Sequence, residues 1–550
     1  MVLRWQDVKP PQIETVCVKH QPLQQLNPTA RVWRTTKECN VSYVYIVDPP
    51  KIGYQVTVHR SCSCNELRAL YNRHLIDRTL QTYHKQYMLE HFRRVSKKWK
   101  FEVEPTTYTN IVNNYHGGKR RMYARARLEL LQFGNRSTDH HVRMFVKPDK
   151  YGVDEINDKV PRAIQYRNPR YNLKIATFLK PFEDAFYHLE GQDGLRVIVK
   201  GMNHVEQADL MIQKSLLFNN PVYISCDHSK FDSTINVDHL KFEHSVYDRS
   251  YRNGHLRMLL RKQLRNRGFT RHGMHYKVEG TRMSGDYNTS LGNCLINRAV
   301  LESWVWHVKH SIILDGDDSV IIVEAPDINK LDVTHFSRCG FTTELQLNYA
   351  LTEVEFCRKR LLMSTPPVLV RNPLRILSNK AVCLRNYGPL GFDKWAFGVM
   401  ECERLITPNL PIVRHFTAGK VIKDEDYHRK LEAGIYHGSI EATCEQLAET
   451  WDLDINTVRA LDQPSEYLGW NSGDIIRKLK NHYSSLLSEQ RDDSEYASCT
   501  TLHRQEIGTR YTTLCPGFIE CWNAHGAPIL GYESYARCFA CRPTPIFKPP

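Results

Sequence analysis

The stretch Ile312-Ile313-Leu314-Asp315-Gly316-Asp317-Asp318-Ser319-Val320-Ile321-Ile322-Val323 decides the fold prediction. Two apolar, β-branched runs flank a Gly-Asp-Asp turn, a pattern that predicts a buried β-hairpin. Three carboxylates lie near its tip, where like charges repel unless a cation or a shared proton relieves them. Asp-Gly turns are common in ordinary hairpins, so this stretch alone favours an ordinary hairpin. The segments before it reverse that preference.

The composition describes a large, basic, globular protein. The 550 residues are enough for several domains or for one enzyme built of subdomains, and 41% are hydrophobic, which excludes a disordered chain. A net charge of +15 favours a polyanionic partner, although a membrane-surface or ribosome-associated protein would carry the same charge. The 16 dispersed cysteines predict reduced thiols in a cytosolic protein. No apolar run reaches the roughly 18 residues that span a bilayer, and we expect no signal peptide.

Two cysteines near the N-terminus precede a helical pattern that runs from Glu66 to about His91. Cys62 and Cys64 are separated by one residue. This is poor metal-binding spacing unless two further ligands lie nearby, so we expect ordinary thiols there.

Three basic segments precede the hairpin. In 93–101 and 117–127, Lys and Arg are interleaved with aromatic residues. This suits a groove that follows a phosphodiester backbone and stacks bases, although a solvated charged face explains each run at least as well. In 145–171, cations alternate with Pro and apolar residues, which predicts an extended segment whose side chains converge on phosphate oxygens.

A strand and a helix complete the pattern. Residues 221–227 predict a short buried strand that ends at Asp227, and a Ser284-Gly285 loop leads into a helix from about Asn288 to Val308. Asp227 as an ordinary helix N-cap, and the helix as one that binds no ligand, remain alternatives. If the strand and the hairpin lie in one sheet, with the helix packed beside them, Asp227 and Asp317 would both reach a pair of Mg²⁺ ions.

This ordered set resembles the palm of viral RNA-dependent RNA polymerases of positive-strand RNA viruses, most closely the tombusvirus and carmovirus branch. The resemblance covers about residues 115–385. The matching segments are 227–232 with motif A, 284–293 with motif B, 316–318 with motif C, 147–170 with motif F and 355–358 with motif E.

The resemblance implies an α+β fold of the right-hand polymerase type, with fingers, palm and thumb, an antiparallel palm sheet and helices on one face. The implied parts are an N-terminal extension that bridges fingers and thumb (1–110), fingers (111–221) with an insertion (246–280), palm (222–245 and 281–365), a helical thumb (366–495) and a Cys/His-containing tail (496–550).

The resemblance also implies RNA-templated synthesis of RNA from NTPs, with release of pyrophosphate, in the replication of a viral genome. Asp227, Asp317 and Asp318 would be catalytic and would bind Mg²⁺, for which Mn²⁺ would substitute. The other implied roles are ribose and nucleotide selection by Asp232, Ser284, Gly285, Thr289 and Asn293, triphosphate binding by Lys147, Lys150, Arg162, Arg167 and Arg170, and a primer grip at Glu355, Phe356, Cys357 and Arg358.

One family feature is missing. Motif D of the family often contains a lysine that protonates pyrophosphate, but the corresponding loop, 340–344, has none. Lys359, Lys330 or a water molecule remain alternatives for that role.

The implied partners are the RNA template, the nascent RNA and NTPs, with other viral replication proteins and, indirectly, host membranes. The implied location is the host cytoplasm at membrane-associated replication sites, without a transmembrane segment in this chain. The tail contains Cys499, His503, Cys515, Cys521, His525, Cys538 and Cys541. Cys538-x-x-Cys541 has zinc-knuckle spacing, but the irregular partners favour ordinary buried thiols over structural Zn²⁺.

Two other functions are weighed. A reverse transcriptase usually has an apolar residue before Asp-Asp and a steric gate where this chain has Asp232, so both features disfavour it. A non-catalytic RNA-binding protein would explain the charge but not the ordered acids.

Overall fold

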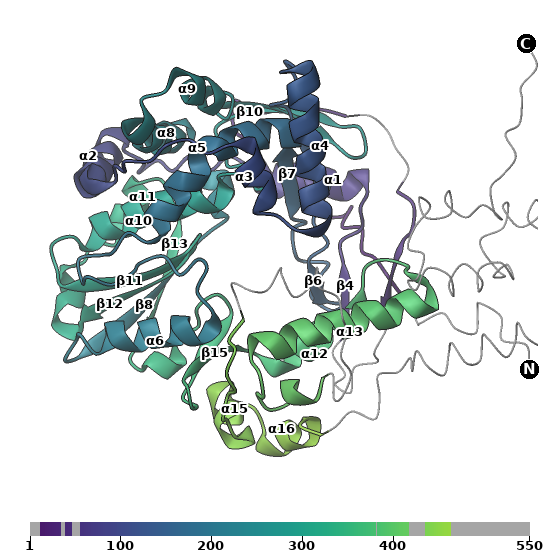
Figure 1. Ribbon diagram of the computed structural model, residues 1–550, viewed down its shortest axis with the longest axis vertical. Coiled ribbons are helices and arrows are strands. Elements are labelled where there is room, and N and C mark those ends of the chain that lie inside the picture. The colour runs from purple at the N-terminus through teal and green to yellow at the C-terminus, as the bar shows by residue number, and fades with distance from the viewer. Residues whose placement is uncertain (1–11, 35–38, 47–54, 381, 417–434, 464–550) are drawn as a thin grey trace, which may run out of the picture.

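A four-stranded antiparallel sheet, named the central sheet below because the candidate site lies on it, is on the left of Figure 1. The computed structural model describes residues 12–34, 39–46, 55–380, 382–416 and 435–463. The strand order is β11-β12-β8-β13. The strands are β8 (Pro221–His228), β11 (His310–Asp315), β12 (Asp318–Glu324) and β13 (Thr343–Asn348). The predicted hairpin and the strand that carries Asp227 are therefore confirmed, and they share one sheet.

Helices cover both faces of this sheet. Ile321 and Val323 pack with α10 (Thr289–Val305) and α8 (Val237–Tyr251), whereas Val320 and Ile322 pack against α6 (His204–Ser215) on the opposite face. Figure 1 shows α10 and α6 on opposite sides of the strands. The expectation of helices on one face is wrong, because strands that are apolar at consecutive positions need cover on both faces.

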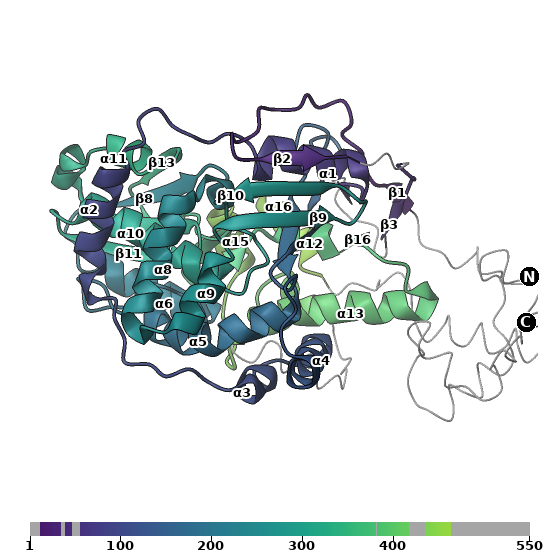
Figure 2. The same cartoon turned by 90° about the horizontal axis from the view of Figure 1, so that it is seen from above.

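A second sheet has the strand order β2-β10-β9-β5-β7, and β9 and β10 run side by side in Figure 2. β5 and β9 are parallel, and the other neighbours are antiparallel. The strands are β2 (Arg31–Trp33), β5 (Val142–Val146), β7 (Ala163–Arg167), β9 (Arg265–Thr270) and β10 (His275–Glu279). The helices of this region are α3 (Tyr108–Asn113), α4 (Gly117–Phe133), α5 (Pro169–Tyr187) and α9 (Gly254–Arg261).

The helix expected from Glu66 to His91 is broken. It consists of α1 (Ser63–Ala69), a π-helical turn η2 (Leu70–His74) and α2 (Lys85–Val95), followed by the 3₁₀ turn η3 (Ser96–Lys98). The chain leaves the helix because the backbone of Leu75 and Asp77 forms hydrogen bonds with residues 25–27. A long-range pairing therefore overrides the local helical pattern.

The N-terminal strands tie distant parts of the chain together. β1 (Gln12–Glu14) and β16 (Val382–Cys383) flank β3 (Tyr43–Ile46), and β4 (Val56–Val58) pairs with β6 (Lys150–Gly152). Residues 56–58 are thus joined to residues 150–152, and residues 45–46 to residues 382–383.

The C-terminal part of the described chain is mainly helical. A hairpin of β14 (Lys359–Leu362) and β15 (Val368–Arg371) precedes α12 (Pro373–Lys380), α13 (Gly388–Ile406), α15 (Cys444–Thr450) and α16 (Ile455–Leu461). Shorter elements are α7 (Phe231–Thr234), η4 (Ala325–Lys330), α11 (Thr334–Arg338), η5 (Leu351–Glu353) and η6 (Val413–His415). The cysteines and histidines predicted in the 496–550 tail lie outside the described residues. None of the described helices combines the length and apolarity needed to cross a membrane.

Candidate active site

Four carboxylates form a row across one face of the central sheet, one from each strand. In the register of the strands, Asp315 pairs with Asp318, Asp318 comes beside Asp227, and Asp227 pairs with Glu344. Paired residues of antiparallel strands point to the same face. Asp317 lies in the turn at the end of this row, and Asp227, Asp317 and Asp318 are exposed.

The row carries excess negative charge. Lys200 forms an ion pair with Asp315, but within the described residues Asp227, Asp317 and Asp318 form none. Loss of hydration raises the pKa of Asp318, and repulsion from Asp317 raises it further, although the Cys357 thiol donates a hydrogen bond to its carboxylate. Exposed, uncompensated carboxylates are the ligands that a hard divalent cation prefers.

The three exposed carboxylates are near one another but not tightly gathered. Among the described residues, they do not form a group whose ligand atoms all lie within 4.8 Å of one another. Mutual repulsion favours this spreading, and exposed side chains are free to turn. A donor set of oxygens on adjacent strands therefore fits Mg²⁺, provided that the side chains turn inward as the cation neutralises them.

Side chains of helix α10 form hydrogen bonds with the backbone of the Gly316-Asp317 turn. The buried Asn297 donates hydrogen bonds from Nδ2 to the backbone oxygens of Gly316 at 3.1 Å and Asp317 at 3.2 Å. The sulfur of Cys294 accepts a hydrogen bond from the Gly316 N–H at 3.2 Å. Our sequence analysis missed Asn297. The available signal was its spacing from Asn293, which places both amides on one helix face.

His228 extends this network to the neighbouring strands. Because the Asn297 amide nitrogen donates to the turn, the Asn297 amide oxygen is the group that accepts a hydrogen bond from His228 Nε2, at 3.0 Å. The other ring nitrogen, His228 Nδ1, then accepts from the Thr343 hydroxyl at 2.8 Å. Burial lowers the pKa of His228, which keeps the ring neutral in this tautomer. The turn, β8, β13 and α10 are therefore fixed to one another.

Two of the predicted ribose-selecting residues are in direct contact. Asn293 Nδ2 donates to the Asp232 carboxylate at 2.8 Å, and Arg282 Nε donates to the Asn293 oxygen at 3.0 Å. Arg282 is in turn held by buried Glu243, with Nη2 2.5 Å from its carboxylate. Burial raises the pKa of Asp232. The Asp317 charge raises it further, so this polar pair on α7 and α10 lies near the Asp317 turn.

The remaining residues predicted to select the nucleotide dock a loop onto β7. Ser284 Oγ accepts from the Gln165 N–H at 3.2 Å, and the Gly285 N–H donates to the Gln165 oxygen at 2.6 Å. A Cβ at Gly285 would come within 2.7 Å of the Tyr166 Cβ. The Thr289 hydroxyl donates to a backbone oxygen of its own loop at 2.8 Å. These residues position the start of α10.

The five predicted triphosphate-binding cations are not all brought together. Arg167 is buried and pairs with Asp286 at 2.7 Å, and Arg170 is buried between Asp139 and Glu129, the latter at 2.6 Å. Their engaged guanidinium groups conflict with the expected contact to a triphosphate. The sequence pattern showed the cations but not the distant acids that complement them.

The other three cations differ in availability. Lys147 and Arg162 are both partly exposed and share Asp149, at 2.9 and 3.5 Å. Lys150 instead donates to the backbone oxygen of Asn379, and burial lowers its pKa to about 8. Lys147 and Arg162 are therefore the predicted cations that remain accessible.

Sequence reasoning assigned no role to two further cations: Arg73, which lies near Arg162, and Lys230, which lies near Arg73. Burial lowers the pKa of Arg73, and the Arg162 charge lowers it further, while Asp232 acts in the opposite direction. Lys230 Nζ donates to the Asn72 backbone oxygen at 2.9 Å. Burial, and to a smaller extent the charges of nearby arginines, lower the pKa of Lys230 to about 8. Lys230 was visible between the two aspartates of 227–232, whereas Arg73 had no sequence signal.

The sequence matches the family described as viral RNA dependent RNA polymerase over residues 30–484. The chain belongs to this viral RNA-dependent RNA polymerase family.

Known relatives are RNA-directed RNA polymerases of plant viruses. Identity is 33% over 354 residues with that of Maize chlorotic mottle virus, 32% over 360 residues with that of Tobacco necrosis virus and 32% over 344 residues with that of Carnation mottle virus. These alignments cover 60, 63 and 60% of this chain but 36, 48 and 45% of the relatives. The predicted tombusvirus and carmovirus resemblance is confirmed, and the chain spans less than half the length of these relatives.

In this polymerase-family chain, the motif E resemblance corresponds to a tight turn. Phe356 and Lys359 exchange both backbone hydrogen bonds, at 2.9 and 3.0 Å. Between them, Cys357 and Arg358 have φ values of 51° and 59°, as a type I′ turn requires. Phe356 is buried under the central sheet, and Glu355 and Arg358 are exposed. The turn brings the Cys357 thiol to the carboxylate row.

The two lysines considered for the missing motif D residue of the polymerase family lie in different places. Lys330 ends η4, after the far end of β12, and pairs with Asp327 at 2.7 Å. Lys359 is buried and donates to Gln207 at 2.6 Å. Burial lowers the pKa of Lys359, while the nearby Asp315 charge acts in the opposite direction. Only Lys359 lies near the carboxylates.

Proposed function

We propose that this chain catalyses RNA-templated RNA synthesis. In this reaction the 3′-hydroxyl oxygen of the growing RNA bonds to the α-phosphorus of an NTP. The bond from that phosphorus to the oxygen bridging to the β-phosphate breaks, pyrophosphate leaves with the bond's electron pair, and the hydroxyl proton passes to solvent water. The observation that carries the proposal is the row of carboxylates from adjacent strands, in a chain of the polymerase family.

Each part of the site has a role in this proposal. Asp227, Asp317 and Asp318 hold Mg²⁺, or Mn²⁺ in its place, which activates the hydroxyl and stabilises the leaving pyrophosphate when bound. Asn297 positions the turn through its two hydrogen bonds. The Asp232–Asn293 pair offers both an acceptor and a donor to a ribose 2′-hydroxyl.

For the triphosphate, we propose Lys147 and Arg162, extended by Arg73 and Lys230. Partial exposure of Lys147 and Arg162 supports this set, as does the chain of neighbours in which the Arg162 charge lowers the pKa of Arg73 and the Arg73 charge lowers the pKa of Lys230. Arg167 and Arg170 position this region through buried ion pairs, and Lys150 joins it to α12.

The proposed subdomains keep the predicted boundaries: palm 222–245 and 281–365, fingers 111–221 and 246–280, thumb 366–495, and a bridging extension 1–110. Pairing of β3 with β16 and of β4 with β6 supports the bridge between fingers and thumb. The primer grip is the 355–358 turn. The proposed partners are template and nascent RNA, NTPs, other replication proteins and, indirectly, host membranes, in the host cytoplasm.

Templated synthesis tests the proposal. The full chain is incubated with an RNA template of defined 3′ end, Mg²⁺ and labelled NTPs. We expect full-length complementary RNA, and a loss of at least about 100-fold for Asp317→Asn, which removes one charge at constant volume. Asp209→Asn, an exposed carboxylate on α6, is the matched control and should retain wild-type synthesis.

Two outcomes contradict the proposal. Synthesis only with dNTPs would indicate a reverse transcriptase. RNA binding without synthesis, in wild type and Asp317→Asn alike, would indicate a non-catalytic RNA-binding protein.

A further inference from the structure

Three cysteines from separate segments meet outside the carboxylate site. Cys17 follows β1, Cys39 precedes β3 and Cys64 lies in α1, yet their sulfur atoms all lie within 4.8 Å of one another. The expectation of ordinary thiols at Cys62 and Cys64 rested on the absence of nearby ligands. The fold supplies those ligands from Cys17 and Cys39.

Cys62 supplies a fourth sulfur next to Cys17, outside the group of three whose sulfur atoms all lie within 4.8 Å of one another. Cys62 Sγ is 3.8 Å from Cys17 Sγ. Four sulfurs placed tetrahedrally at a Zn–S distance of about 2.3 Å are separated from one another by about 3.8 Å. A disulfide would join two of these sulfurs at about 2.05 Å and would not account for the convergence of the others.

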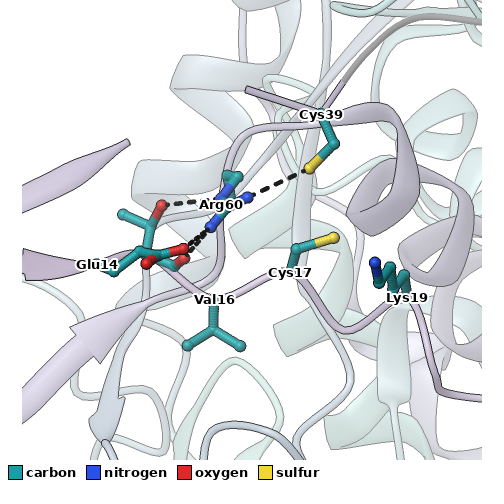
Figure 3. A pocket seen from close by; sticks show the side chains of 7 residues that line it. Glu14, Val16, Cys17, Lys19, Cys39 and Arg60 are labelled. Atoms are coloured by element: carbon teal, nitrogen blue, oxygen red, sulfur yellow. Dashed lines mark hydrogen bonds and ion pairs between the residues drawn. The ribbon is translucent and has the colours of Figure 1, made fainter. Parts of the chain in front are cut away.

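The surroundings suit a site of net negative charge. Figure 3 shows Cys17, Cys39, Lys19 and Arg60 lining one pocket. Arg60 Nη1 donates to Cys39 Sγ at 3.5 Å, and Nη2 of the same guanidinium group pairs with Glu14. Four thiolates around one Zn²⁺ carry a charge of −2, which these two cations would partly balance.

This part of the chain has little apolar packing of its own. β1, β3 and β4 have three or four residues each. Among the described residues, the buried members of the cluster beneath them are Val44, Val56, Val58 and Val382. Small units of this kind commonly rely on a metal or a cross-link for stability.

We propose that Cys17, Cys39, Cys62 and Cys64 bind one structural Zn²⁺. The ion fixes the N-terminal strands to α1. Through β3 and β4, it holds in place the segment that joins residues 150–152 to residues 382–383.

Zinc content tests this site in the full chain. The protein is produced with added zinc, purified without chelators and measured by elemental analysis. Cys39→Ser and Cys64→Ser should each lose one equivalent of zinc, whereas Cys39→His, which offers an imidazole ligand, should retain it. Cys444→Ser, a half-buried thiol elsewhere, and a double Cys538→Ser/Cys541→Ser variant should leave this equivalent unchanged.

Alkylation of the wild-type protein keeps the test independent of variant folding. Peptide mass spectrometry should find the four cysteines protected from iodoacetamide until a chelator removes the zinc, and then alkylated without reductant. Full zinc retention in Cys39→Ser and Cys64→Ser would overturn the proposal. So would wild-type protein without zinc, or a disulfide between any two of the four.

Discussion

Asn297 offers a direct test of how the fold positions the Asp317 turn. Asn297→Ala removes two hydrogen bonds to the turn and one from His228, at 3.1, 3.2 and 3.0 Å. At about 1 kcal/mol net for each bond, the free energy of unfolding should fall by about 3 kcal/mol. Because Asn297 holds a proposed metal-ligating turn, synthesis should also fall about 10- to 100-fold.

The assay combines urea unfolding with templated synthesis over a range of Mg²⁺ concentrations. Asn297→Ala should need more Mg²⁺ for half-maximal activity, which a purely structural loss would not cause. Ser303→Ala is the control, since this buried hydroxyl of α10 bonds within its own helix and to His335, away from the turn. An unchanged Mg²⁺ dependence in folded Asn297→Ala, or the same shift in Ser303→Ala, would refute the reasoning.

Three other predictions concern the loop, the ribose pair and pH. Gly285→Ala should cut synthesis at least about tenfold, because its Cβ would lie 2.7 Å from the Tyr166 Cβ and displace the loop; wild-type rates would contradict this. Asn293→Ala should reduce discrimination against dNTPs while NTP incorporation continues, and unchanged discrimination in competition assays would oppose the assignment. Burial lowers the pKa of His74 to about 3 and of His239 to about 4. The unfolded chain therefore takes up protons first, and urea unfolding should show stability falling below pH ~6.5 by about 1.4 kcal/mol per pH unit for each histidine. Constant stability down to pH 5 would contradict this.

Local patterns allowed the central elements to be predicted. The 312–323 hairpin and the strand before Asp227 follow from apolar runs and a turn sequence that specify their own conformation. The Asp232–Asn293 contact could be expected only through the family resemblance, because it joins two separate elements.

The features that were missed depend on the tertiary fold. The helical pattern after Glu66 breaks because Leu75 and Asp77 bond to residues 25–27, which no local window contains. The burial of Arg167 depends on Asp286, far along the chain. The convergence of Cys17 with Cys64 likewise depends on contacts between segments that the sequence does not place side by side.

The central claim is that Asp227 and Asp317 act on the same divalent cations. Electron paramagnetic resonance tests this claim by measuring Mn²⁺ binding to the full chain in the presence of template RNA and a non-hydrolysable NTP. The variants are Asp227→Asn, Asp317→Asn and the double variant, and Asp209→Asn is the control. Each single variant should weaken Mn²⁺ binding, and the double variant should weaken it much less than the sum of the two effects. Unchanged binding in Asp227→Asn, or strictly additive effects, would contradict the account.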